Sequence, residues 1–323
     1  MTPQSDSTFT VVGTGGVGGF FGALLHQGGL RVRFLARGKH LEALREHGLR
    51  VESGGRMFVV PPANIARSPE EAGKADVVLF CVKSYDTVTA ARSLGPLLHD
   101  GTIIISLQNG VENEDIIARS IPRGTVFGGV AYVYATITEP GVVTEHGGPK
   151  KIVFGPRTAS PGLLERGGEI LRAVQGAGVD AECTPNIAEA LWKKFLFITA
   201  VGGMTALTRL TLGEILASPE TRAVLHSAMR ETLAVANACG VPLGAGYIDE
   251  VFERLKKYDN SSRSSLYHDL ANNRRLEIDA LSGAVVRLGR RHGVPTPVHE
   301  VIVGALLPYH RRALGAMSTR QGP

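Results

Sequence analysis

The chain has 323 residues, of which 43% are hydrophobic and 20% are charged, so it can bury a substantial core and is not disordered. A chain of this length is expected to form roughly two domains. The formal net charge of +5 is too small for this length to indicate a nucleic-acid-binding protein. It suits an anionic small-molecule partner instead.

The three cysteines, Cys81, Cys183 and Cys239, lie far apart and form no CxxC pair. This spacing argues against a disulfide framework and against a structural zinc or other metal site, and each cysteine is expected to be a buried core thiol. The first eight residues are polar and lack the apolar core of a signal peptide. No run of about 18 uninterrupted apolar residues is present, so we expect a cytoplasmic protein with no membrane partner.

Strands and helices alternate through the first half of the chain. In chain order the pattern predicts a strand at 9–12, a glycine cluster, a helix at 20–27, a strand at 31–35, a helix at 41–46, a strand at 76–82, a helix at 87–98 and a strand at 101–107. The strand at 76–82 is apolar after Asp76, and both it and the strand at 101–107 read as strands buried on both faces. This order predicts an α/β domain with a doubly wound, mainly parallel sheet.

The character changes after residue 126. An antiparallel hairpin is predicted from 136–138 and 142–144, followed by a strand at 151–155, a helix at 163–175 and a strand at 179–183. Beyond Pro185 the pattern is helical, at 187–200, 219–238, 245–257, 276–292 and 298–313. We therefore expect a Rossmann domain over 1–185, which binds NADP, and an all-helical substrate domain over 186–323.

A glycine-rich motif of the form GxGxxG follows the first predicted strand and opens the first helix. Its residues are Gly13, Thr14, Gly15, Gly16, Val17 and Gly18. The first glycine of such a motif makes the tight turn, the second lets the backbone approach a pyrophosphate, and the third lets helix and strand pack closely. The helix N-terminus then stabilises the phosphate charge. The motif predicts a dinucleotide site, with a ligand-free glycine turn as the alternative.

The end of the second strand indicates which dinucleotide is bound. A site for NAD has an acidic residue there for the ribose hydroxyl, whereas this chain has Arg37 and Lys39. A guanidinium can pair with the 2′-phosphate of NADPH, so Arg37 favours that cofactor. A solvated surface arginine is the alternative.

Two further candidate residues follow buried strands, where open α/β sheets bind their ligands. Lys83 follows the third predicted strand, and its charge would help to neutralise phosphate. Asn109 follows the fourth and would bridge the cofactor to the substrate. The Asn109-Gly110 pair is also a common turn signal, which is the alternative explanation.

Taken together, these residues and several later motifs resemble the ketopantoate reductase family over nearly the whole chain. The motifs are the glycine loop, Arg37, Cys81-Val82-Lys83, Leu107-Gln108-Asn109-Gly110, Leu191-Trp192-Lys193-Lys194, Ser264-Ser265-Leu266-Tyr267-His268-Asp269 and Glu277-Ile278-Asp279. The resemblance implies a Rossmann domain followed by an all-helical domain like that of 6-phosphogluconate dehydrogenase. It also implies NADPH-dependent reduction of a branched 2-oxo acid.

The resemblance assigns roles residue by residue. Lys194 matches the catalytic lysine and also a substrate contact. Asn109 matches a residue that touches cofactor and substrate, and Ala135 a backbone contact to the cofactor. Ser265 matches a serine that binds the substrate carboxylate, and Glu277 a glutamate that contacts the cofactor. The alternatives are a solvated lysine pair, a helix-capping serine and a surface carboxylate. Twelve positions separate Ser265 from Glu277, so either the helix breaks near Asn272-Asn273 or the two residues contact different parts of the bound cofactor and substrate.

The chain departs from the family pattern at three positions. The family has asparagines four and eight residues after the catalytic lysine and another downstream, where this chain has Ile198, Gly202 and Leu212. A site that hydrogen-bonds a substrate hydroxyl discriminates strongly, and an apolar pocket does not. The reaction class is therefore better supported than ketopantoate itself as the substrate.

Three interpretations follow. The leading one is reduction of a 2-oxo acid with NADP(H), either ketopantoate or a more apolar substrate of a paralogue. The second is a related hydroxy-acid or sugar-acid dehydrogenase that works oxidatively. The third is a regulator that senses NADPH without turnover, which would have no need of the proton donor Lys194. A homodimer is a possible assembly.

Overall fold

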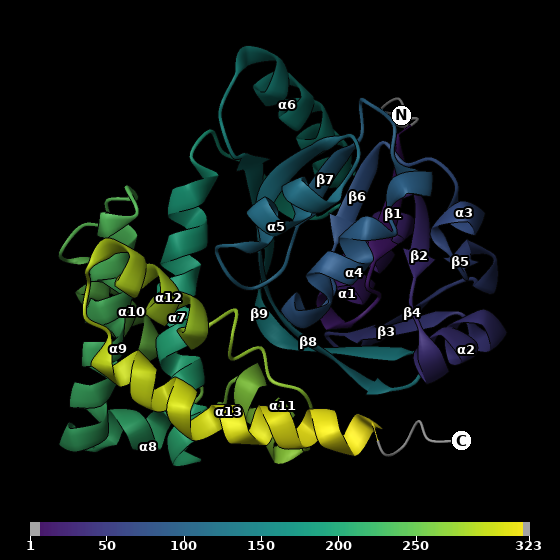
Figure 1. The fold of residues 1–323 in the computed structure, drawn as a ribbon. Helices are drawn as coiled ribbons and strands as arrows, with labels where there is room; N and C mark the ends of the chain where they lie inside the picture. Colours follow the sequence, from purple (N-terminus) through teal and green to yellow (C-terminus); the bar gives the residue numbers. More distant parts are fainter. Residues whose placement is uncertain (1–6, 319–323) are drawn as a thin grey trace. The chain divides into compact units, whose positions relative to one another are not determined.

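The structure, a computed structural model, describes residues 7–318. The chain divides into two compact units (Figure 1). The first comprises the residues up to Gln108 together with Asn113–Ala190, and the second comprises Asn109–Glu112 and the residues from Leu191 onward. The short segment Asn109–Glu112 thus packs with the second unit although its neighbours on both sides belong to the first, which the sequence did not indicate.

The first unit is built on a ten-stranded mixed sheet. The strands are β1 (Thr8–Val12), β2 (Arg31–Leu35), β3 (Leu49–Ser53), β4 (Arg56–Val60), β5 (Ile65–Ala66), β6 (Val77–Phe80), β7 (Ile103–Ser106), β8 (Thr125–Glu139), β9 (Val142–Pro156) and β10 (Asp180–Cys183). Their order is β4-β3-β9-β8-β7-β6-β1-β2-β5, with β10 paired to β9. Only the β3–β4 and β8–β9 pairs are antiparallel, so the expected mainly parallel, doubly wound sheet is confirmed.

Alternate side chains of the central strands point to opposite faces of the sheet. Because these side chains are apolar on both faces, helices cover both faces. The helices are α1 (Gly16–Gln27), α2 (Gly38–His47), α3 (Pro69–Ala72), α4 (Thr87–Arg92), α5 (Asn113–Ser120) and α6 (Pro161–Gly176). Val11 joins one buried cluster with side chains of α1 and α6, whereas Val12 joins another with side chains of α4 and α5. Ile103 and Ile104 divide in the same way. The apolar runs in the sequence therefore reflect strands that are buried on both faces.

Several parts of this unit differ from the sequence-based expectation. The β3–β4 hairpin was not predicted, although its turn, Gly54-Gly55, has positive φ at both residues and is a common hairpin signal. The predicted hairpin at 136–144 is confirmed, but it is longer, because β9 continues without interruption through the separate strand expected at 151–155. The helix predicted at 87–98 ends at Arg92, and a short 3-10 helix, Gly95–Leu97, follows.

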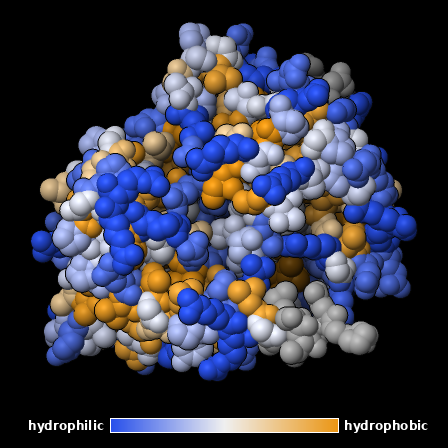
Figure 2. Space-filling model, in the orientation of Figure 1, coloured by the Kyte–Doolittle hydropathy of each residue, from blue (hydrophilic) through white to orange (hydrophobic). Residues whose placement is uncertain are grey.

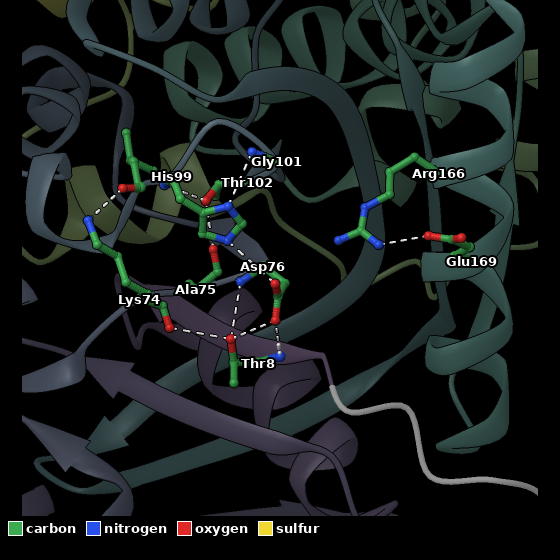
Figure 3. A network of polar contacts seen from close by, with 10 residues as sticks. Thr8, Lys74, Ala75, Asp76, His99, Gly101, Thr102, Arg166 and Glu169 are labelled. Atoms are coloured by element: carbon green, nitrogen blue, oxygen red, sulfur yellow. Dashed lines mark hydrogen bonds and ion pairs between the residues drawn. The ribbon is translucent and has the colours of Figure 1, made fainter.

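A polar network joins the amino-terminal ends of the central strands (Figure 3). The backbone N–H and the hydroxyl of Thr8 donate to one oxygen of Asp76, at 2.8 and 2.9 Å, and His99 lies 3.4 Å from the other. Burial acts to raise the pKa of Asp76, but the bonds from Thr8 and the nearby His99 lower it overall. Asp76 immediately precedes β6, so its bonds to Thr8 join the starts of β1 and β6. These bonds lie at the end of the sheet opposite the glycine loop.

The second unit is helical. Its helices are α7 (Ile187–Thr208), α8 (Leu212–Ala217), α9 (Pro219–Ala238), α10 (Tyr247–Leu255), α11 (Ser265–Ala271), α12 (Ser282–His292) and α13 (Pro297–Ser318). The short helices α8 and α11 were not predicted, and α12 begins six residues later than expected. Within the described residues, α7 alone is long and apolar enough to span a membrane, but 61% of that stretch is buried, as in the core helix of a folded domain.

The surface of the helical unit carries some exposed apolar side chains. On α13, Val301, Tyr309 and Leu314 are exposed. Figure 2 shows hydrophobic residues between hydrophilic ones on the visible face of the protein. Single exposed apolar residues are ordinary on protein surfaces, so they do not identify an interface. The homodimer considered from the sequence therefore stays a prediction.

Candidate active site

The glycine-rich loop lies between β1 and α1, and its glycines are required by close backbone approaches. Gly13 has a φ of +96°, and a Cβ there would lie 2.7 Å from the backbone nitrogen of Val82. A Cβ on Gly18 would collide with the carbonyl oxygen of Gly13. By contrast, a Cβ on Gly15 would meet no atom within 4 Å, so the backbone is open to a ligand at that position. These three positions have the properties that a pyrophosphate-binding turn needs.

Gly16 is a fourth required glycine, which the GxGxxG pattern does not specify. A Cβ at Gly16 would overlap the carbonyl oxygen of Ala135 on β8. Ala135 was expected to contact the cofactor through its backbone, and the structure places that backbone against the first residue of α1. Within the described residues, no side chain forms a capping hydrogen bond at the N-terminus of α1. The backbone N–H groups of its first turn are therefore available to a ligand.

The loop is anchored to the end of β2. The carbonyl oxygen of Leu35 accepts hydrogen bonds from the backbone N–H groups of Gly13 and Thr14, each at 3.1 Å, and from the Thr14 hydroxyl at 2.9 Å. The Thr14 side chain is consequently buried, and only the loop backbone is left to bind a ligand. The first turn of α1, with Val17 half-buried, offers backbone N–H groups to a phosphate. The residues present therefore fit a dinucleotide pyrophosphate.

Arg37 lies at the start of α2, next to this loop in the same unit. Its guanidinium is 72% exposed and forms an ion pair with Asp86, which the sequence analysis did not identify. Asp86 ends a short 3-10 helix, Ser84–Asp86, and Lys83 is the half-buried residue before it. A phosphate bound by Arg37 would thus share it with a carboxylate. No sequence signal links two residues 49 positions apart.

In the helical unit, the structure brings Lys194 close to Glu277. Burial lowers the pKa of Lys194 to about 8, and the charge of Glu277 acts in the opposite direction. Glu277 is 7% exposed and lies in the non-helical segment before α12. Neither residue is the solvated surface charge that was the alternative explanation. A lysine that gives up its proton near neutral pH suits proton transfer.

Ser265 is the first residue of α11 and is exposed. Capping of this helix is performed by Ser264, whose side chain accepts from the backbone N–H of Tyr267 and bonds the hydroxyl of Thr205 on α7 at 2.7 Å. The capping role that was the alternative for Ser265 is therefore wrong. The helix ends at Ala271, and Asn273 has a φ of 52°, so the expected break between Ser265 and Glu277 is confirmed.

The three positions that depart from the family pattern have different surroundings. Ile198 and Gly202 follow Lys194 by four and eight residues, so all three lie along one face of α7. A Cβ on Gly202 would meet only Leu266, at 4.0 Å. Leu212 is 3% exposed and belongs to the core of the unit. Its place in the argument for an apolar substrate pocket is therefore lost. Gly202 is buried and Ile198 packs partly against the same core, so their place in that argument rests on the face of α7 that they share with Lys194.

Asn109 is half-buried and lies on the segment Asn109–Glu112, which belongs to the same unit as Lys194 and Glu277.

Among residues 7–318, no group of three His, Cys, Asp or Glu side chains could hold a metal ion. The three cysteines are free and half-buried against the two cores, rather than fully buried as expected.

Comparison with known proteins gives consistent matches over most of the chain. The family described as "Ketopantoate reductase PanE/ApbA" matches residues 9–159, and its C-terminal counterpart matches residues 186–310. A 2-dehydropantoate 2-reductase of Halobacterium salinarum is 34% identical over 89% of this chain and 94% of its own length. One of Archaeoglobus fulgidus is 32% identical over 91% and 94%.

Solved structures agree with the sequence matches. A PanE/ApbA family ketopantoate reductase from Ralstonia eutropha superposes with a TM-score of 0.84 at 32% identity, covering 95% of this chain and 99% of its own. A 2-dehydropantoate 2-reductase from Geobacter metallireducens gives 0.85 at 31% identity, covering 93% and 99%.

The contact between Gly16 and Ala135 predicts that Gly16→Ala destabilises the first unit. The added methyl group must displace the β8 backbone, and overpacking of this kind costs about 1–3 kcal/mol of unfolding free energy. Urea denaturation would measure the loss. Gly162→Ala is the matched control, since a Cβ at Gly162 meets nothing within 4 Å. Equal stability of the two variants would contradict the close approach at Gly16.

Proposed function

The chain belongs to the ketopantoate reductase family, and we propose that it reduces a 2-oxo acid to the 2-hydroxy acid with NADPH. Ketopantoate, the substrate of 2-dehydropantoate 2-reductases, is the first candidate. The observation that carries the proposal is Lys194, with a pKa of about 8, beside the buried carboxylate of Glu277. In this proposal the protein is a cytoplasmic oxidoreductase acting on CH–OH groups.

The two units divide the work in this proposal. The loop Gly13–Gly18 and Ala135 place the pyrophosphate at the N-terminus of α1, while Arg37 and Lys83 bind phosphate charge. The bound dinucleotide supplies the hydride.

Negative charge develops on the ketone oxygen as the carbonyl carbon is reduced. The ammonium of Lys194 hydrogen-bonds that oxygen and then transfers a proton to it. Asn109 orients the substrate beside the cofactor, Ser265 binds its carboxylate, and Glu277 holds the charge of Lys194 and contacts the cofactor. A regulator that only senses NADPH would need neither the lowered pKa of Lys194 nor its buried partner.

A more apolar 2-oxo acid is the second candidate substrate. Ile198 and Gly202 extend along the face of α7 that carries Lys194, and the nearest neighbour of Gly202 is the apolar Leu266. This face offers no polar side chain at the two positions where the family has asparagines. A substrate hydroxyl would lack those partners, whereas an alkyl or aryl group would not need them.

The first prediction from this proposal concerns Lys194. Lys194→Ala lowers kcat/KM by roughly 10²–10⁴, because a positioned general acid contributes about that factor. The affinity for NADPH stays nearly unchanged, since other residues bind the dinucleotide. In the unmodified protein kcat/KM falls as pH rises through about 8, where the ammonium loses its proton, and the variant lacks this limb. Steady-state kinetics between pH 6 and about 10 would measure both effects.

Lys193→Ala is the matched control for that experiment. Lys193 points about 100° away from Lys194 around α7, and its ammonium lies 5.5 Å from the centre of the Tyr247 ring. Its loss should change kcat/KM far less. Comparable losses in both variants, or near-normal turnover by Lys194→Ala, would remove Lys194 from the proton-transfer role.

The second prediction concerns cofactor choice. NADPH binds more tightly than NADH, and Arg37→Asp weakens NADPH preferentially because it removes the cation that binds the 2′-phosphate. Asp86→Asn has the opposite effect, since it releases Arg37 from its competing carboxylate. Fluorescence titration with NADPH and with NADH would measure the dissociation constant of each dinucleotide for both variants. Equal affinities of the unmodified protein for NADPH and NADH would count against the assignment.

The third prediction concerns the substrate. With Ile198 and Gly202 in place of amides, an alkyl or aryl 2-oxo acid should match or exceed ketopantoate in kcat/KM. NADPH oxidation by the purified protein with a panel of 2-oxo acids would measure this. The deoxy analogue of ketopantoate is the informative control. If ketopantoate is preferred over that analogue by orders of magnitude, the apolar-pocket argument is wrong.

A further inference from the structure

We propose that His40 is a positioning residue for the glycine-rich loop, because its neutral imidazole ties the loop backbone to the turn of the β8–β9 hairpin. This inference rests on the proposed function, in which the loop binds the pyrophosphate of NADPH. The role of His40 is indirect, since the imidazole bonds Thr14 and Gly141 and acts on the cofactor only through the loop.

The two hydrogen bonds of His40 fix its protonation state. Its Nε2 lies 2.8 Å from the carbonyl oxygen of Thr14, and its Nδ1 lies 3.0 Å from the backbone nitrogen of Gly141. A carbonyl oxygen can only accept and a backbone N–H can only donate. Nε2 must therefore carry the hydrogen and Nδ1 must be bare. Only the neutral Nε2–H tautomer satisfies both partners, and burial lowers the pKa of His40, which favours the neutral form.

The imidazole completes a set of contacts around the loop. Leu35 at the end of β2 already accepts three hydrogen bonds from Gly13 and Thr14. The β8–β9 hairpin touches the next part of the loop directly, where the carbonyl of Ala135 abuts Gly16. Through His40, the turn of the same hairpin also holds the Thr14 carbonyl. One hairpin therefore restrains the loop at two points, on either side of the open position at Gly15.

This placement also connects two parts of the proposed cofactor site. Arg37 is the residue that precedes α2, and His40 is the third residue of that helix. The helix that presents the guanidinium to the 2′-phosphate is thus the one that fixes the pyrophosphate loop. A site whose backbone is already held in the binding geometry loses less entropy when the ligand binds. Loss of His40 should then weaken dinucleotide binding without altering proton transfer at Lys194.

Three variants separate the two hydrogen bonds. His40→Gln places an amide donor near the position of Nε2 and keeps the bond to Thr14. His40→Asn places an amide oxygen near the position of Nδ1 and keeps the bond from Gly141. His40→Leu keeps neither. The matched control is His47→Gln, at the other end of α2, where the side chain is 68% exposed.

The dissociation constant of NADPH is measured for each variant by nicotinamide fluorescence, with kcat and the KM of the 2-oxo acid at saturating NADPH. His40→Leu should raise the NADPH dissociation constant by about 3–10-fold, the usual worth of a hydrogen bond. His40→Gln should recover most of the affinity, and His47→Gln should have none of the effect. In every variant kcat and the KM of the 2-oxo acid should stay within about twofold, as expected when the effect lies in cofactor binding.

The outcomes that overturn the inference are distinct from those that overturn the proposed function. If the unmodified protein binds neither NADPH nor NADH, the proposed function fails and the inference fails with it. If it binds NADPH and His40→Leu binds equally well, or if His40→Leu lowers only the stability, the inference alone fails.

A second measurement applies even if His40→Leu does not fold. Long-range ¹H–¹⁵N NMR spectra of the unmodified protein report which imidazole nitrogen of His40 is protonated. Hydrogen on Nε2 alone at neutral pH is expected. Hydrogen on Nδ1, whether alone or together with Nε2, overturns the inference, because it is incompatible with the bond from Gly141.

Discussion

The close approach of backbone to backbone at the first βα turn is the constraint on which the rest of the first unit depends. At Gly13 and Gly18 the residues that follow β6, together with β1 and the turn itself, leave no room for a side chain. At Gly16 the same is true between α1 and β8. Between these crowded positions, a Cβ on Gly15 would meet no atom within 4 Å. The tight packing fixes the path of the turn, and the backbone at Gly15 stays accessible to a ligand.

The burial of the central strands on both faces decides where polar chemistry can occur. Val77–Phe80 is buried throughout, and Ile103–Ser106 likewise, so these strands cannot present functional side chains along their length. Polar groups are confined to the strand ends. At the amino end Asp76 and Thr8 satisfy one another, whereas the carboxyl ends lead into the glycine loop, Lys83 and Asn109. The placement of the candidate site at one edge of the sheet follows from this burial.

The sequence predicted what depends on local pattern. The apolar strands, the glycine loop and α9, with the expected bounds Pro219–Ala238, each carry a signal within a short window. The β3–β4 hairpin was missed although its Gly54-Gly55 turn is a local signal, but most of what determines the site depends on contacts between distant residues. The ion pair of Arg37 with Asp86 joins positions 49 apart, and the burial of Leu212 is decided by the packed core. The segment before α12 reads as helix in the sequence, yet it is non-helical and carries Glu277. Tertiary packing overrides helical propensity there.

The pair Lys194 and Glu277 shows why a proton donor needs two opposing influences. Burial alone penalises the ammonium and moves the pKa of Lys194 downward. Without an opposing charge the pKa of this lysine would be lower still, and less of it would carry a proton at neutral pH. Glu277, itself 7% exposed, favours the charged form and holds the pKa at about 8. At that value the lysine is mostly protonated at neutral pH and still releases its proton readily. The carboxylate therefore makes this half-buried lysine usable as an acid.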